Sequence, residues 1–344
     1  MLKKMGILFV VVASQQIAHS SLVPWTFCLK KKFTHELSPT RLEYTYHLQK
    51  KDPISEFSQL LCSWNALRPA RGYFRFWCRA HDAQSNSWLP WHQMYEWGDG
   101  IQQSFVSKKP GASDYIHVRL EMPPKKFADG FEIYVEPIDG ADLCLIKMIS
   151  VAISKFPLFE PEKIGSQHAT LRSVHIAQIP RSSQMILKHS NADVLCSPTS
   201  LSMVTSFLGK TPIDAVKFAN NVYDDGLKAY GSWPFNIAHA FEKLNGAVYF
   251  NVERLHDFCS LHAHLCNNIP VVVSVRGYLK GAPKSYPHGH LLVVVGYDRK
   301  NKKVLCHDPA APLNSKVFKR YDLRSFLAAW ERSHRLAYIG EPIL

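Results

Sequence analysis

The chain has 344 residues, of which 46% are hydrophobic and 20% are charged. At about 150 residues per domain this length favours two globular domains, and the composition argues against long disorder or a collagen-like fibre. The chain carries 41 lysine and arginine residues against 28 aspartate and glutamate residues, a formal net charge of +13. Such a charge favours attraction to nucleic acid, lipopolysaccharide or acidic lipid. The basic residues are scattered and no nucleic-acid-recognition motif accompanies them, so we expect no specific nucleic-acid binding.

The first 20 residues have the pattern of a secretory signal peptide. Lys3 and Lys4 form a charged start, residues 7–13 an apolar run, and residues 18–20 a small-residue cleavage site. The apolar run is shorter than the roughly 18 residues that cross a bilayer as a helix, and we expect no transmembrane segment. A buried N-terminal strand is the alternative interpretation. The favoured prediction is export to the periplasm or medium, with residues 1–20 removed.

Residues 21–160 have the pattern of an all-β domain. Aromatic and β-branched residues alternate with a period of two over Tyr73–Trp77, Tyr115–Leu120 and Phe131–Val135. Turn residues separate these runs and no helical period persists, which predicts an antiparallel β-sandwich.

Most of the tryptophans lie in this N-terminal segment. Large aromatic side chains usually fill the core of a small β domain. The same side chains could instead form a platform on which a sugar stacks. An anionic cell-surface or sugar ligand therefore stays open for this domain. The tryptophans concerned are Trp64, Trp88, Trp91 and Trp97.

The pattern changes after a polar, aperiodic stretch at 161–173, which is the predicted linker. Helix starts now appear, the first at Ser197-Pro198, and continuous apolar, β-rich runs follow them. Helices first and antiparallel strands afterwards predict an α+β domain over 174–344. The predicted helices begin near residues 197, 212, 232 and 255, and the predicted strands cover 247–252, 270–275, 290–297, 303–307 and 336–339.

Eight cysteines are spread along the chain with no Cys-x-x-Cys pair and no Cys/His spacing of the structural zinc kind. A zinc finger is thereby excluded, and we expect no metal ion and no cofactor. Export would permit disulfides, but their pairing does not follow from the sequence.

Cys196 is the candidate nucleophile. It directly precedes Ser197-Pro198, whose proline suits a first helical turn, and a helix N-terminus favours a thiolate. Downstream, His290 follows a glycine at the entrance of an apolar strand, where its ring can face the helix end. His288 follows a proline in a loop, and we expect it to be solvated.

Two further residues complete the chemistry of acyl transfer. Asp308 ends the strand adjacent to that of His290, so its carboxylate can hold the orientation and tautomer of the imidazole. Gln184 lies on the segment that leads into the helix, where an amide N–H could join the Cys196 backbone N–H in binding an oxyanion.

Taken in order, these segments resemble the C39-like cysteine peptidases, a papain-like group. The resemblance implies a papain-like fold and a protein or peptide substrate, with Cys196 as nucleophile, His290 as base, Asp308 as orienting residue and Gln184 as oxyanion donor. Ser197 stands where a glycine usually follows the nucleophile. The segments that carry the resemblance are Gln184, Asp193–Ser200, Gly231–Asn236, Gly289–Asp298 and Asp308-Pro309.

The N-terminal half is similar to the β-sandwich module that accompanies this peptidase domain in some exported bacterial proteins, through Ser63–Ala66 and Trp91–Gly98. The favoured prediction is therefore an exported cysteine peptidase whose front domain binds or positions the substrate. Two alternatives stay open. A cell-wall peptide amidase also orders Cys before His, but often much closer together in sequence. A catalytically silent papain-like binding protein would have no need of the Cys, His and Asp.

Overall fold

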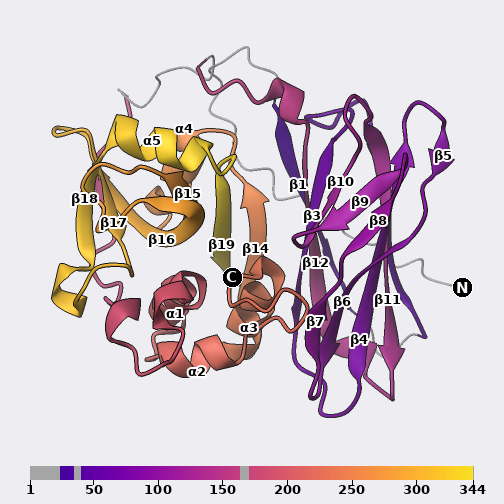
Figure 1. Ribbon diagram of the computed structural model, residues 1–344, viewed down its shortest axis with the longest axis horizontal. Helices are drawn as coiled ribbons and strands as arrows, with labels where there is room; N and C mark the ends of the chain where they lie inside the picture. Colours follow the sequence, from indigo (N-terminus) through magenta and orange to yellow (C-terminus); the bar gives the residue numbers. More distant parts are fainter. Residues whose placement is uncertain (1–23, 35–39, 163–169, 344) are drawn as a thin grey trace, which may run out of the picture.

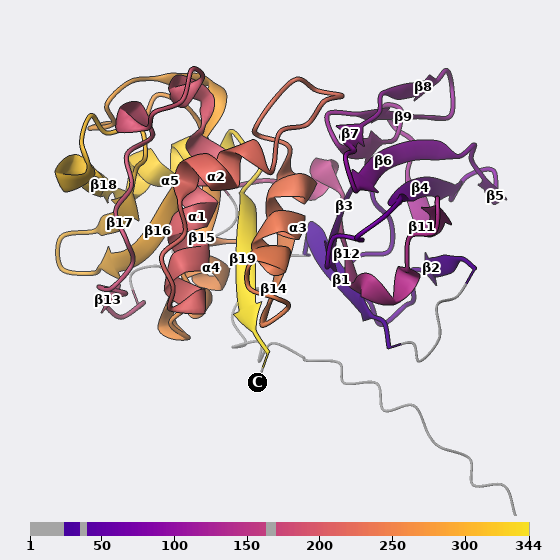
Figure 2. The same cartoon turned by 90° about the horizontal axis from the view of Figure 1, so that it is seen from below.

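The computed structural model describes residues 24–34, 40–162 and 170–343, which form antiparallel sheets with a few helices. The predicted signal peptide at 1–20 lies outside the described residues, as does most of the predicted linker. Figures 1 and 2 show the strands of the N-terminal half on one side and the α-helices with a further sheet on the other. Within the described part of the chain, no helix is long and apolar enough to cross a membrane.

Two six-stranded sheets make up the N-terminal half. The first has the order β1 (Thr26–Lys32), β12 (Ile146–Ser154), β3 (Gln59–Ala66), β10 (Arg119–Glu121), β9 (Ser113–Ile116) and β8 (Ser107–Lys109). The second has the order β2 (Leu42–His47), β11 (Ala128–Ile138), β4 (Tyr73–Asp82), β6 (His92–Gly98) and β7 (Gln102–Ser104), with β5 (Ser87–Trp88) paired to β4.

The C-terminal half contains a seven-stranded antiparallel sheet with helices packed against it. Its order is β14 (Val248–Arg254), β19 (Leu336–Pro342), β15 (Val271–Gly277), β16 (Tyr286–Asp298), β17 (Lys303–His307) and β18 (Phe318–Asp322), with β13 (Val174–His175) paired to β16. The helices are α1 (Cys196–Gly209), α2 (Ala215–Asn220), α3 (Trp233–Lys243), α4 (Phe258–Cys266) and α5 (Leu323–Glu331).

The two N-terminal sheets pack face to face through aromatic side chains. Alternate residues of β4 are buried, as its period of two predicts. Trp64 of the first sheet contacts Phe76 and Tyr95 of the second, at ring distances of 4.4 and 4.9 Å. Trp64 and Trp97 are fully buried in this core, whereas Trp88 and Trp91 are half-buried. The platform of four tryptophans is therefore not formed.

One predicted strand is wrong. The run Tyr115–Leu120 is a hairpin in the structure, because β9 ends at Ile116 and β10 begins at Arg119. Between them His117 and Val118 have φ values of 47° and 57°, in the left-handed region. A β-branched residue rarely adopts that region, so the sequence carries no signal for this turn.

The first N-terminal sheet also packs against the C-terminal half, where α3 and β14 lie on β3. Phe235 and Ala238 of α3 belong to the aromatic core between the two sheets, and Leu61 and Ala152 to the core of the C-terminal half. Each core is thus completed by side chains from the other half.

The side-chain amide of Asn65 joins the two halves. It makes the two hydrogen bonds to the backbone of Phe250 that a neighbouring strand would make. Its Nδ2 donates to the carbonyl of Phe250, and the N–H of Phe250 donates to its Oδ1, both at 2.7 Å. Asn65 is fully buried, so water cannot replace these bonds.

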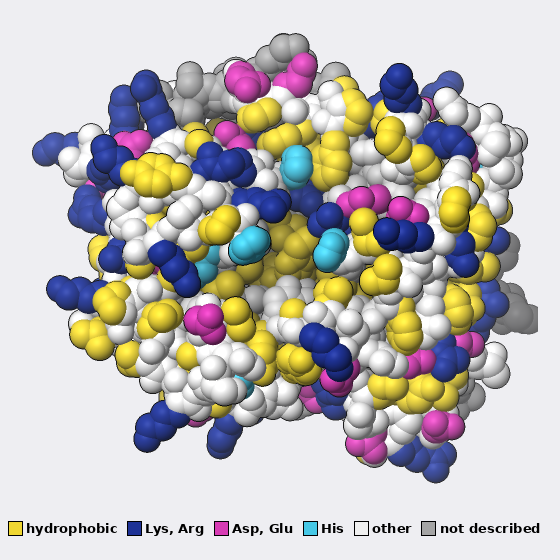
Figure 3. Space-filling view, viewed as in Figure 1, with side chains coloured by type: hydrophobic (Ala, Val, Ile, Leu, Met, Phe, Trp, Pro, Cys, Tyr) yellow, Lys and Arg dark blue, Asp and Glu magenta, His cyan; other side chains and the backbone are white. Residues whose placement is uncertain are grey.

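Figure 3 shows lysine and arginine spread over one face among acidic and apolar side chains, as expected for a generally cationic surface. No disulfide joins any two of the eight cysteines, all of which lie in the described part of the chain.

We expect Asn65→Ala to lower the free energy of unfolding by about 2–4 kcal/mol, because it leaves two buried backbone groups of Phe250 without partners. Urea unfolding followed by tryptophan fluorescence measures the change. Gln84→Ala, at an exposed position of the same half, is the control. Equal unfolding midpoints for the two variants would mean that the Asn65 bonds do not stabilise the contact between the halves.

Candidate active site

Cys196 is the first residue of α1 and is half-buried. The unpaired N–H groups of the first helical turn give this end of the helix a partial positive charge, which stabilises a thiolate. Two hydroxyl groups hold the turn in place. Ser200 donates to the carbonyl of Leu291 in β16 at 3.0 Å, and the Ser197 hydroxyl lies 3.0 Å from that of Tyr338 in β19.

His290 lies within β16 rather than at its entrance, and its side chain is buried. The preceding Gly289 has a φ of +95°, and the pairing of β15 with β16 shifts register between Val275 and Gly277. Glycine tolerates this conformation, which interrupts the ordinary alternation of the strand. His288 is consequently exposed while His290 faces the core. The ring of Tyr286 stacks on that of His290, with centroids 4.1 Å apart.

Asp308 directly follows β17 and is fully buried. One of its carboxylate oxygens accepts hydrogen bonds from His290 Nε2 at 2.8 Å and from the backbone N–H of Ala310 at 2.9 Å. The other accepts from the hydroxyl groups of Tyr286 at 2.8 Å and Tyr321 at 2.6 Å. Both oxygens are therefore satisfied without water.

His290 lies between the other two residues, since its Nε2 bonds to Asp308 and its imidazole lowers the pKa of Cys196. His290 Nε2 faces Asp308, so Nδ1 is the nitrogen left to face the sulfur. The backbone N–H groups of Leu291 and Ser197 also lower the pKa of Cys196. Cys196, His290 and Asp308, predicted from different segments, thus lie in series.

Electrostatics favour the charged form of all three groups. Burial alone would raise the pKa of Cys196, but the bond and charge of His290 outweigh it and lower that pKa. Burial would lower the pKa of His290, but Asp308 and Cys196 raise it to about 9. Burial would raise the pKa of Asp308, but His290 and the hydrogen bonds from Tyr321 and Ala310 lower it to about 2. A thiolate, an imidazolium and a carboxylate therefore stabilise one another.

Gln184 bonds to the segment that precedes Cys196 and to the segment that follows Asp308. Its backbone N–H donates to the carbonyl of Pro309, beside Asp308, at 2.8 Å. Its side-chain Nε2 donates to the carbonyls of Ala192 and Asp193, at 3.0 and 2.8 Å, in the turn that leads into Cys196. Both amide hydrogens are thus engaged, and the buried Oε1 has no partner. The oxyanion role of Gln184 stays a prediction.

The sequence did not reveal the two tyrosines that bond to Asp308. Tyr286 lies four residues before His290, and only the bulge of β16 brings its ring onto the histidine. Tyr321 lies in β18, a strand that the hydrophobic pattern did not predict. No spacing rule connects either tyrosine to Asp308.

A hollow of about 690 Å³ lies beside the site. Met185 follows Gln184 and Ala310 follows Asp308-Pro309, so the hollow borders the segments that carry Gln184 and Asp308. Its lining is apolar apart from two lysines. The lining residues are Met185, Pro283, Lys284, Ala310, Pro312 and Lys319.

A family model covers the residues of this site. The model of the Peptidase_C39 like family matches residues 176–338, which include Cys196, His290 and Asp308. Among solved structures the chain is similar to xylellain, a cysteine protease from Xylella fastidiosa, with 13% identity, a TM-score of 0.35, and coverage of 54% of this chain and 91% of that one. No curated protein matches the sequence. The match to the Peptidase_C39 like family over residues 176–338 supports a C39-like, papain-like cysteine peptidase.

Proposed function

We propose that the protein cleaves peptide bonds with Cys196 as nucleophile, His290 as general base and acid, and Asp308 as the residue that orients the histidine. The observation that carries the proposal is the hydrogen bond between His290 and the buried carboxylate of Asp308, together with the lowering of the Cys196 pKa by the same imidazole. The match to the family model supports a peptide or protein substrate. Nucleophile, base and orienting group within bonding reach are what acyl transfer requires.

The proposed reaction begins from the thiolate–imidazolium pair. The sulfur of Cys196 attacks the carbonyl carbon of the scissile bond, a carbon–sulfur bond forms, and the carbonyl electron pair moves to oxygen. His290 then gives its Nδ1 proton to the leaving amine as the carbon–nitrogen bond breaks. In the second half, His290 removes a proton from water, which attacks the thioester and releases the acid and Cys196. Asp308 stays ionised throughout, because its pKa is about 2.

The oxyanion would form next to the N-terminus of α1, whose N–H groups stabilise negative charge. In our proposal Gln184 is the second donor. To donate, it exchanges a hydrogen bond to Ala192 or Asp193 for one to the oxyanion.

The hollow beside Asp308 and Gln184 is the proposed substrate site. Its apolar lining would hold a hydrophobic side chain, and Lys284 and Lys319 would attract an acidic one. We interpret the two N-terminal sheets as a β-sandwich accessory domain that supports the peptidase half. Export, with removal of residues 1–20, belongs to the same proposal and rests on the sequence pattern alone.

The function is tested by incubating the protein with a proteome-derived peptide library and mapping new termini by mass spectrometry. We expect cleavages that are absent with Cys196→Ala and retained with Cys144→Ser, which removes a half-buried thiol of the N-terminal half. If Cys196→Ala and the wild type give the same peptides, the catalytically silent binding protein becomes the better interpretation.

The ion pair predicts the pH dependence of thiol reactivity. Because the pKa of Cys196 is lowered, its alkylation by iodoacetamide should remain fast at pH values where an ordinary thiol, near 8.5, is protonated. His290→Ala should move this profile upward towards 8.5 and reduce peptide turnover by roughly 10²- to 10⁴-fold. Turnover by the wild type should fall as pH rises through about 9, where His290 loses its proton.

The matched control for this experiment is His288→Ala, since His288 is exposed and only two residues away. The readout is the alkylation rate of the Cys196 peptide against pH. A larger shift with His288→Ala than with His290→Ala would overturn the assignment of the base, and no shift with either variant would exclude the ion pair.

Two roles of Gln184 can be separated by experiment. If it stabilises an oxyanion, Gln184→Ala should lower kcat by roughly 10²- to 10³-fold and leave the iodoacetamide profile of Cys196 unchanged, because alkylation forms no oxyanion. If it only holds the turn at Ala192 and Asp193, the alkylation rate should change as well. Parallel kinetics and alkylation of this variant distinguish the two roles.

A further inference from the structure

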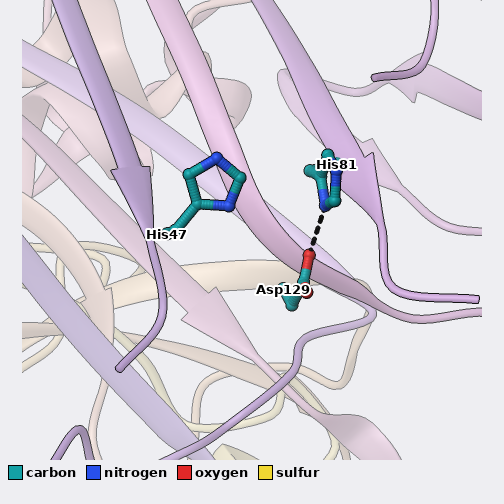
Figure 4. A group of neighbouring side chains, drawn as sticks. All are labelled: His47, His81 and Asp129. Carbon is teal, nitrogen blue, oxygen red and sulfur yellow. Dashed lines mark hydrogen bonds and ion pairs between the residues drawn. The ribbon is translucent and has the colours of Figure 1, made fainter. Parts of the chain in front are cut away.

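A second cluster of polar side chains lies in the N-terminal half, away from Cys196. His47 is at the end of β2, His81 is in β4, and Asp129 is in β11, the strand between them (Figure 4). In the sheet register Gly130 is opposite His47 on one side and His81 on the other. The two histidines therefore flank a glycine in one row across three strands.

The backbone of β11 is irregular at this point. Its pairing with β4 shifts register between Ala128 and Gly130, which leaves Asp129 as the extra residue of a bulge. A bulge redirects a side chain that would otherwise point to the opposite face, so Asp129 reaches the face that carries the histidines. Its Oδ1 lies 2.7 Å from His81 Nδ1.

Gly130 leaves open the space next to His47. A Cβ atom at this position would lie 2.8 Å from His47 Nδ1 and 3.1 Å from its Cε1. Any larger residue would therefore push the imidazole away from the cluster. The rings of His47 and His81 are 5.0 Å apart, and Trp88 packs edge-on against each of them at 5.1 Å.

We propose that His47, His81 and Asp129 bind a divalent transition metal ion, with Zn²⁺ as the best fit. Each residue offers one ligand atom, and these atoms all lie within 4.8 Å of one another. Metal–ligand bonds of about 2.0–2.2 Å in a tetrahedron place neighbouring ligand atoms about 3.3–3.6 Å apart. Two imidazoles and one carboxylate are a ligand set that Zn²⁺ accepts, with a fourth position for water.

The surroundings allow the small adjustment that binding requires. His81 has a side-chain exposure of only 10% and is held by Trp88, whereas His47 is exposed and Asp129 has a side-chain exposure of 38%. The fixed histidine would anchor the metal ion while the other two ligands turn towards it. Because β2 is an end strand of its sheet, the ion would fasten that edge to β4.

The test uses the full chain, untagged and freed of metal, in a Cys196→Ala background that removes the thiol of the peptidase site. Isothermal titration with ZnCl₂ should show one ion per chain, and the melting temperature should rise with added Zn²⁺. His47→Ala and Asp129→Asn should each weaken binding by roughly 100-fold or more, since even outer-shell changes cost 10- to 100-fold.

His117→Asn is the matched control, because His117 is an exposed histidine of the same half in a left-handed turn that asparagine tolerates. It should bind Zn²⁺ as the parent does. Substitution by Co²⁺ adds a second readout, a tetrahedral spectrum without a thiolate charge-transfer band. A thiolate band, an unchanged affinity in His47→Ala, or no binding by the parent chain would overturn the proposal.

Discussion

Burying a carboxylate without compensation costs several kcal/mol, and the fold supplies four donors to the carboxylate of Asp308. These donors come from β16, from β18 and from the chain just after β17, so the charge draws three neighbouring segments together. His290 is one of them, and its orientation follows from the same requirement. The lowered pKa of Cys196 depends in turn on His290. The electrostatics of the site therefore begin at a residue that never touches the thiol.

The N-terminal sheets are joined by hydrogen bonds to the C-terminal half, in which Cys196 lies. The buried carboxylate of Asp224 accepts hydrogen bonds from the N–H and hydroxyl of Ser104 in β7, at 2.9 and 2.6 Å. The loop that begins there continues to Tyr230, whose hydroxyl contacts Asn191 in the segment before Cys196. Hydrogen bonds and this loop thus connect the N-terminal sheets to the segment that precedes Cys196.

Residue patterns within single segments predict the parts of the site that depend on local structure. The helix start at Ser197-Pro198, the glycine before His290 and the Asp308-Pro309 strand end each appear in the sequence, and the structure brings the three segments together. Contacts set by tertiary packing were not predictable. The register shift in β16 places Tyr286 on His290, and the amide of Asn65 joins two halves separated by a long stretch of sequence. The bulge at Asp129 likewise leaves no trace in the hydrophobic alternation.

The position of β19 bears on how the protein matures during synthesis. This strand is the last in chain order among the described residues, yet it lies inside its sheet, between the end strand β14 and β15. Cys196 leaves the ribosome long before His290, Tyr321 and β19 do. Until those segments arrive, the sulfur of Cys196 lacks the imidazole that lowers its pKa, and the sheet beside α1 is incomplete. The surroundings that lower the pKa of Cys196 are therefore completed only late in synthesis, after β16 and its neighbouring strands have formed.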